Sequence, residues 1–256
     1  MQNNTFFEDS DSNNIFVFEE LPSTNDYLKE LLSKVKPLAP YTVIMAKNQT
    51  AGKGQRGNVW QTLPHQNLTA SFLLSPLNLP LSKQFLLTIV SSLAVYDTLI
   101  AFTPKMVHIK WPNDILLDAK KVAGILIENK ISANCIAHSI IGIGLNIYQD
   151  GFAPEIAHKT TSLILENPGL EVPVEEFAKL LQQKLKYYME IALDQQQELL
   201  ALYNQRLFNR NLIKQYQFLD QLVEGEIVQV EMDGLLQIRI KDKIYKVDLK
   251  GISYIL

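Results

Sequence analysis

The stretch VHIKWPNDILLDAKKVAGILIENKISANCIAHSIIGI, residues 107–143, decides the fold class. Its apolar runs are strand-sized and are separated only by short turns. The runs at 107–109, 115–117, 122–131 and 135–143 therefore predict successive strands with no helix between them. Strands joined in this way favour an antiparallel or mixed sheet over a doubly wound parallel one.

Helices are expected on both sides of that stretch. Ser23 follows a short strand and can cap a helix, with Asp26 at the capping-box position three residues later. Apolar residues recur at helical spacing through 82–102, and 173–206 predicts a long amphipathic helix or a helix pair. We therefore expect an α+β fold in which a mixed, mostly antiparallel sheet packs against helices.

The C-terminal part has a different sequence pattern, with short strand-like segments and no helical spacing. Segments 227–232, 235–240 and 243–247 predict strands joined by hairpin turns at Asp233-Gly234 and Lys241-Asp242, and 252–256 closes a small barrel. We predict a domain boundary near Arg210. It would separate a larger domain, 1–210, from a small SH3-like β-barrel, 211–256.

Composition excludes several broad classes. The chain has 256 residues, 47% of them hydrophobic, and a net charge of −3, so neither nucleic acid nor an anionic membrane is expected as a partner. The polar, acidic N-terminus is no signal peptide, and the single cysteine, Cys135, fits a reducing cytoplasm. Between Glu30 and Asp97 there are six basic and no acidic residues, which suggests a small anionic ligand.

That basic window contains a glycine-rich loop, Gly52-Lys53-Gly54-Gln55-Arg56-Gly57. It matches the pattern of a dinucleotide fold, yet no helix start follows it, and the kinase motifs that would accompany a similar loop are missing. Its glycines can present backbone N–H groups to an anion, and Lys53 and Arg56 can add positive charge. A cationic surface loop without a ligand is the open alternative.

A second candidate functional motif, after the glycine-rich loop, is Lys110-Trp111-Pro112-Asn113-Asp114. An ordinary turn explains Pro-Asn-Asp, but not the Lys and Trp before it or the continuation Lys-Val-Ala-Gly-Ile-Leu-Ile-Glu at 121–128. A hairpin with Asp114 on one strand and Lys121 on the next can direct both side chains into one pocket.

Taken together, these segments resemble the signatures of biotin–protein ligases. The matching elements are Ser-Thr-Asn at 23–25, the glycine loop ending in Trp60, Lys-Trp-Pro-Asn-Asp, Lys-x-x-Gly-Ile-Leu, and Gly-x-Gly-x-Asn at 142–146, in the same order. The resemblance implies activation of biotin with ATP and Mg²⁺, and its transfer to a lysine of a biotin carboxyl carrier protein. Only 22 residues precede Ser23, so we expect a monofunctional type without a DNA-binding domain; a homodimer stays open.

The resemblance also implies roles for particular residues. Biotin would contact Ser23, Thr24, Asn25, Gln49, Gly52, Lys53, Gly54, Gln55, Lys121, Gly142 and Gly144. ATP and the adenylate would contact Lys53, Gly54, Gln55, Arg56, Trp60, Lys110, Asn113, Asp114, Lys121 and Asn146. Catalysis would rest on Lys121, Lys53 and Arg56, and Asp114 would hold the metal or orient the incoming amine.

The sequence differs from the family pattern at one position, and three alternative functions stay open. The family loop usually reads Gly-Arg-Gly-Arg-Arg-Gly, so Gln55 stands where an arginine is common. Lipoate ligases and octanoyltransferases share the expected fold, but the transferases need a cysteine nucleophile, and Cys135 is expected to serve packing. The third rival is an inactive scaffold that binds biotin or a carrier, and the retained Lys121 argues against it.

Overall fold

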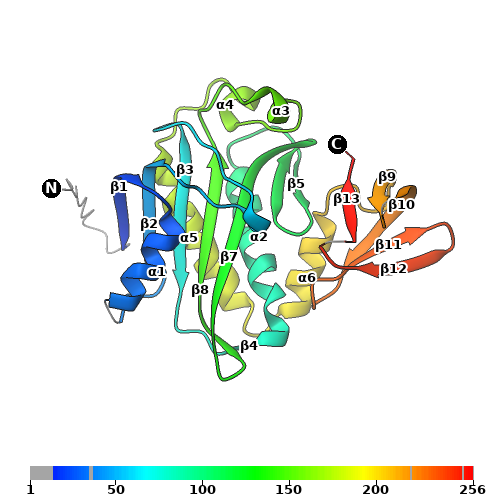
Figure 1. Cartoon of the computed structure of the whole chain (residues 1–256), viewed down its shortest axis with the longest axis horizontal. Coiled ribbons are helices and arrows are strands. Elements are labelled where there is room, and N and C mark those ends of the chain that lie inside the picture. Colours follow the sequence, from blue (N-terminus) through cyan, green and yellow to red (C-terminus); the bar gives the residue numbers. More distant parts are fainter. Residues whose placement is uncertain (1–13, 35–36, 220, 250, 256) are drawn as a thin grey trace.

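The computed structural model describes residues 14–34, 37–219, 221–249 and 251–255. A large sheet occupies the centre of the molecule and a smaller one lies beside it at the C-terminal end (Figure 1). The last residue of the predicted closing strand, Leu256, lies outside the described residues.

The large sheet is mixed, as predicted. Its strands are β1 (Ile15–Leu21), β2 (Val43–Gln49), β3 (Asn67–Leu74), β4 (Leu79–Pro80), β5 (Val107–Lys110), β6 (Asp114–Leu117), β7 (Lys120–Ser132) and β8 (Cys135–Asn146). They run in the order β1-β2-β3-β8-β7-β6-β5, with β4 paired to β8. Only the β1–β2 pair is parallel among the described strands. The predicted strands within 107–143 all exist, and β8 runs on to Asn146.

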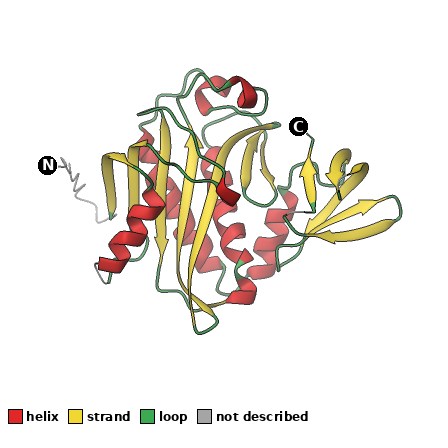
Figure 2. Cartoon of the chain, in the orientation of Figure 1, coloured by secondary structure: helices red, strands yellow, loops and turns green. Residues whose placement is uncertain are grey.

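Helices cover both faces of this sheet. They are α1 (Thr24–Lys34), α2 (Phe85–Leu99), α3 (Pro154–Ala157), α4 (Leu163–Glu166), α5 (Val174–Ile191) and α6 (Gln196–Gln205). Figure 2 shows α1 in front of the sheet and the longer helices behind it. The predicted helix or helix pair of 173–206 is therefore the pair α5 and α6. No helix in the described part of the chain is both long and apolar enough to cross a membrane.

Each sheet face has its own apolar cluster because side chains alternate along a strand. On the α2 and α5 side, the core includes Val43, Met45 and Phe72. On the α1 side, Ile44 and Leu73 pack with Leu28 in a second, smaller cluster. This smaller cluster covers only part of the α1 face, and the rest of that face carries glycines and hydroxyl side chains.

The small sheet is antiparallel and has five strands in the order β12-β11-β10-β9-β13. Its strands are β9 (Ile213–Phe218), β10 (Gln221–Val230), β11 (Leu236–Ile240), β12 (Lys243–Val247) and β13 (Ile252–Tyr254). This is the predicted SH3-like element, but the sequence analysis missed β9 and began the following strand at 227. Gly225 explains the late start: it weakens the strand pattern, yet it lies in β10, where an added Cβ would meet Ile238 Cδ1 at 2.7 Å.

The two sheets share one hydrophobic core. Tyr216 and Ile238 of the small sheet belong to the same buried cluster as Phe85 and Tyr203. Asn204 at the end of α6 bonds to both backbone groups of Val230. The boundary near Arg210 stays a prediction.

Candidate active site

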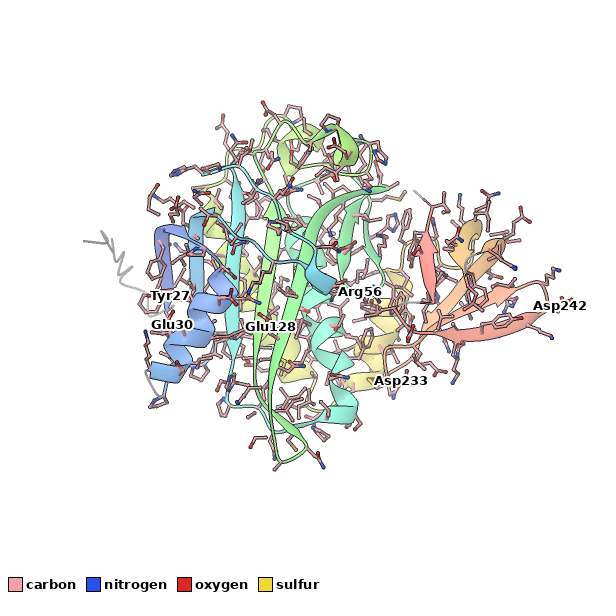
Figure 3. The ribbon with its side chains drawn as sticks, in the orientation of Figure 1. Tyr27, Glu30, Arg56, Glu128, Asp233 and Asp242 are labelled. Atoms are coloured by element: carbon pink, nitrogen blue, oxygen red, sulfur yellow. The ribbon has the colours of Figure 1, made fainter. Side chains whose placement is uncertain are left out.

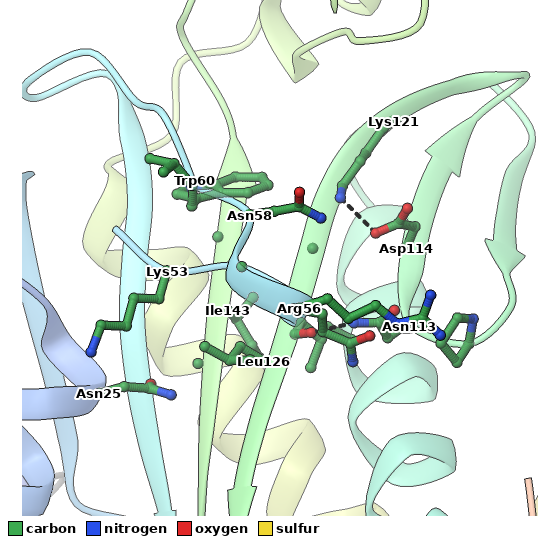
Figure 4. Close-up of a pocket in the computed structure, with 18 of the residues that line it drawn as sticks. Asn25, Lys53, Arg56, Asn58, Trp60, Asn113, Asp114, Lys121, Leu126 and Ile143 are labelled. Atoms are coloured by element: carbon green, nitrogen blue, oxygen red, sulfur yellow. Dashed lines mark hydrogen bonds and ion pairs between the residues drawn. The ribbon is translucent and has the colours of Figure 1, made fainter. Parts of the chain in front are cut away.

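A cavity of about 350 Å³ lies beneath the glycine-rich loop, within the range of small-ligand sites. It extends from the N-terminus of α1 to the turn between β5 and β6 (Figure 4). Its lining includes these predicted residues: Ser23, Thr24, Asn25, Gln49, Lys53, Gly54, Gln55, Arg56, Trp60, Lys110, Asn113, Asp114, Lys121, Gly142 and Gly144. Segments more than a hundred residues apart in sequence thus meet here.

One end of the cavity is neutral and hydrogen-bonding. Ser23 caps α1 by accepting the Asp26 backbone N–H at 3.3 Å, as the sequence indicated. The backbone N–H and the hydroxyl of Thr24 both donate to Gln49 Oε1, at 3.0 and 3.1 Å. The side chain of Asn25 lies against Gly142, where an added Cβ would come within 2.5 Å of Asn25 Oδ1. These α1 side chains are almost completely buried.

The glycine loop is a tight hairpin. Gly54 N donates to Asn58 O at 2.7 Å and Trp60 N donates to Gly52 O at 3.0 Å. A Cβ on Gly52 would meet the Trp60 carbonyl oxygen at 2.4 Å, so only a glycine lets the two hairpin arms approach this closely. At the tip, Arg56 has a left-handed backbone, with φ 57°, and its side chain lines the cavity.

Lys53 is held by an ion pair at the start of α1 and does not point toward Lys110 and Lys121 at the other end of the cavity. Its ammonium lies 2.5 Å from Asp26 Oδ2, and Lys29 lies 3.3 Å from the other oxygen of the same carboxylate. Burial acts to raise the pKa of Asp26, but hydrogen bonds and charge pairing with Lys53 and Lys29 lower it overall. The loop lysine is therefore anchored by a charged carboxylate at neutral pH.

Three elements hold the turn between β5 and β6 in place. Trp111 Nε1 donates to Gly234 O, in the turn between β10 and β11 of the small sheet, at 3.1 Å. The hydroxyl of Tyr203 on α6 donates to Pro112 O at 2.6 Å. Asn113 Nδ2 donates to Ile125 O on β7, which leaves the second N–H and the oxygen of this amide for the predicted nucleotide contact. The turn is thus fixed from the small sheet, from a helix and from the large sheet.

A β-bulge directs Lys121 into the cavity. The ladder between β6 and β7 shifts its register between Ile115 and Leu116. Without this shift, side-chain alternation along β7 would place Lys121 and Gly124 on opposite faces of the sheet. The Lys121 ammonium lies 3.3 Å from where a Cβ on Gly124 would be and 2.6 Å from Asp114 Oδ1. Lys110 contacts Asp114 Oδ2 at 3.2 Å. Both oxygens of Asp114 are thus paired with lysines, as Figure 4 shows for Lys121.

This arrangement bears on the predicted metal role of Asp114. Among the described residues that line the cavity, Asp114 is the only carboxylate. The described part of the chain holds no group of three histidines, cysteines or carboxylates that could bind a metal ion. Because a magnesium ion would have to displace two ammonium groups, Asp114 does not fit a metal site built by the protein.

Two predicted residues lie outside the cavity lining, namely Gly52 and Asn146. Asn146 is buried at the end of β8 and donates to Thr161 O at 3.0 Å. Of the two roles left open for Asn146, the structure favours fixing the strand end.

Several lining residues were missed by the sequence analysis. They are Asn58, Val59, Thr69, Ala70, Trp111, Pro112, Gly124, Ile125, Leu126, Ile143, Leu249, Ile252, Ser253 and Tyr254. The register pairs Thr69 with Gly144, and the period-2 alternation of β3 could have indicated it as a polar position in a buried strand. Tyr254 could not be found this way, because only the tertiary fold brings its ring to 5.4 Å from Lys110 Nζ.

With this geometry established, the chain can be compared with known proteins. Residues 17–146, just over half the chain, match the biotin/lipoate A/B protein ligase family. The chain belongs to that family. The match covers α1, the glycine loop and the strands from β1 to β8.

Curated members of this biotin/lipoate ligase family show the same likeness. A bifunctional ligase/repressor, BirA, from Bacillus spizizenii is 36% identical over 145 residues, which are 56% of this chain and 44% of that protein. The chain thus matches less than half the length of this relative. A biotin–[acetyl-CoA-carboxylase] ligase from Paracoccus denitrificans is 34% identical over 165 residues, covering 63% of this chain and 68% of that one.

Solved structures of the family extend the likeness to the whole fold. The biotin protein ligase from Aquifex aeolicus, determined in complex with biotin and ATP, superposes with a TM-score of 0.76. The alignment covers 94% of this chain and 97% of that one, at 24% identity. At this identity the likeness concerns the fold, including the small C-terminal sheet.

Proposed function

We propose that the protein activates biotin with ATP and transfers it to a lysine of a biotin carboxyl carrier protein. The observation that carries this proposal is the polarity of the cavity. Its α1 end offers neutral hydrogen-bonding groups from Thr24 and Gln49, and its far end offers the lysines 110 and 121. Biotin has a neutral ureido ring at one end and a carboxylate at the other, so it matches this gradient.

The reaction would run in two steps. In the first, a biotin carboxylate oxygen attacks the α-phosphorus of ATP, the bond to the β-phosphate oxygen breaks, and pyrophosphate leaves. In the second, a carrier lysine amine attacks the acyl carbon, AMP leaves, and the nitrogen loses a proton. Lys121, held by Asp114, would neutralise charge as the pentacovalent phosphorus forms, and Arg56 at the loop tip would add a second cation.

Water must be kept from the mixed anhydride between the two steps. The hairpin of residues 52–60 crosses in front of β7 and β8 (Figure 4), and its Trp60 lies against Gly124 and Gly144, so it would screen that intermediate. Magnesium would enter as part of the ATP complex, because the described residues around the cavity offer no metal cage of their own.

The remaining parts of the proposal concern partners and location. The Paracoccus relative is named for acetyl-CoA carboxylase, so we propose the biotin carrier of that enzyme as the acceptor. No operator DNA is expected, since the net charge is −3. The single cysteine, Cys135, fits a reducing cytoplasm, and a homodimer stays open.

A direct transfer experiment tests this function. The protein is incubated with ATP, a carrier domain, and either labelled biotin or labelled lipoate. We expect ATP-dependent labelling of the carrier with biotin and none with lipoate. Labelling with lipoate alone would assign the chain to the lipoate branch of the family, and carrier binding without labelling would indicate a scaffold.

A further inference from the structure

Glu128 is a charged residue just outside the cavity lining, beside the end formed by α1, and no predicted role uses it. It lies on β7, two residues after Leu126, which lines the cavity, so both side chains are on the same sheet face. Figure 3 shows Glu128 beside α1. One carboxylate oxygen, Oε2, accepts Asn25 Nδ2 at 2.7 Å, and the other lies 2.5 Å from Lys29 Nζ.

The carboxylate fixes the orientation of the Asn25 amide. An ionised carboxylate only accepts hydrogen bonds, so the NH₂ group of Asn25 must face Glu128. Its oxygen then faces β3, where the Ser71 hydroxyl donates to Asn25 Oδ1 at 2.5 Å. Asn25 and Ser71 are buried, so neither can exchange its partner for bulk water at low cost.

The fixed orientation of the Asn25 amide also determines which hydrogen bonds the Thr24 hydroxyl can form. The Ser71 hydroxyl lies within donor distance of both Asn25 Oδ1, at 2.5 Å, and the Thr24 hydroxyl, at 2.8 Å, but it has only one proton. Because Asn25 Oδ1 can only accept and is the nearer of the two, the Ser71 proton is committed to Asn25 and withheld from Thr24. The Thr24 hydroxyl donates its own proton to Gln49 Oε1, 3.1 Å away. Without a hydrogen bond from Ser71, the Thr24 oxygen keeps acceptor capacity for a ligand N–H donor.

We propose that Glu128 is a positioning residue that sets which side chains donate and which accept hydrogen bonds at the α1 end of the cavity. It does so through the relay Asn25, Ser71 and Thr24, and makes Thr24 an acceptor for the N–H groups of a ureido ring. This inference rests on the proposed function and names the group on this chain that favours a ureido head over an apolar one.

Lys29 makes the relay testable by a near-isosteric change. Burial acts to lower the pKa of Lys29, but hydrogen bonding and charge pairing with Glu128 and Asp26 raise it overall, so Lys29 is a cation at neutral pH. In Glu128→Gln the ammonium attracts the amide oxygen, which turns the new NH₂ group toward Asn25. The Asn25 amide must then reverse, Ser71 must donate to Thr24, and Thr24 loses acceptor capacity toward the ligand.

The experiment measures the dissociation constants of biotin, desthiobiotin and ATP for the wild type and variants. Desthiobiotin keeps the ureido ring and lacks the sulfur ring. For Glu128→Gln we expect both ureido ligands to bind about tenfold more weakly, as for a ureido N–H left without its acceptor, with ATP unchanged. The double variant Glu128→Gln/Lys29→Met should recover part of the biotin affinity, because its amide oxygen is free to face Asn25.

A purely structural role predicts different results. Loss of the α1–β7 ion pair alone would make the double variant bind biotin no better than Glu128→Gln, and that result would overturn the inference. Unchanged biotin affinity in Glu128→Gln would overturn it as well. Glu226→Gln is the matched control, since it removes another carboxylate that lies 2.5 Å from a cation, Arg239, on the small sheet. A wild type that binds no biotin would overturn the proposed function itself, and this inference with it.

Discussion

The indole ring of Trp60 lies directly on the backbone of Gly144. A Cβ at position 144 would come within 2.2 Å of Trp60 Cε2, and one on the paired Gly124 within 3.1 Å of Cζ3. Among the described residues, Trp60 Nε1 is buried without a hydrogen-bond partner. The two glycines form a floor for the ring at the middle of the cavity, so the loop closes on the sheet through this side chain.

Gly144→Ala should therefore open the loop. The new methyl group cannot coexist with the indole, and overpacking of this kind costs about 1–3 kcal/mol unless the ring moves. We expect a change in Trp60 fluorescence and loss of biotin-dependent adenylation, with little change in thermal stability. Gly151→Ala is the control, because no heavy atom lies within 4 Å of a Cβ there. Full activity in Gly144→Ala would show that the closed loop is not needed.

Lys121→Ala should abolish most of the first half-reaction. A cation directed at the developing charge on phosphorus is worth on the order of 10²-fold or more in rate. The measurement is exchange of labelled pyrophosphate into ATP in the presence of biotin. Lys120→Ala, an exposed neighbour on the same strand, should exchange normally. Near wild-type exchange by Lys121→Ala would refute the assignment.

Gln55→Arg should slow the release of the adenylate. Gln55 lines the cavity at the loop tip, at the position where the sequence resemblance leads us to expect an arginine. A charge-assisted bond from arginine is worth roughly 1–2 kcal/mol more than a neutral one, so release of labelled biotinoyl-adenylate should slow about tenfold. Equal or faster release from the folded variant would indicate that Arg56 already supplies the charge.

Removal of residues 211–256 should impair both half-reactions. Ile252, Ser253 and Tyr254 line the cavity, and Tyr254 lies under the Lys110 ammonium. The shared core also predicts a large loss of thermal stability. A folded protein of residues 1–210 with unchanged kinetics for both steps would reduce the small sheet to a stability cap.

Much of the fold could be predicted because the stretch 107–143 consists of strands with local turns. The site was predictable only where the sequence motif and the pocket coincide, as at Lys121 and Asp114. The β-bulge that directs Lys121 into the cavity has no sequence signal, since it depends on how β6 pairs with β7.

Glu128 shows the limit of sequence reasoning. After the apolar run 122–127 it looks like a solvated charge, and its proposed role follows only from the register that places β7 beside β8 and from the contact with Asn25 of α1. Ser71 was missed for a related reason. A serine in a buried strand carries no motif, and its partners Asn25 and Thr24 are 46 and 47 residues away in sequence.

The most direct test of the central claim is exchange of labelled pyrophosphate into ATP by the wild-type protein without any carrier. Adenylation of a carboxylic acid is reversible, so exchange reports the first step alone and identifies the acid. We predict exchange that requires biotin and does not occur with lipoate or octanoate. Exchange without any added acid, exchange with lipoate in place of biotin, or no exchange from a folded protein that binds ATP would contradict the account.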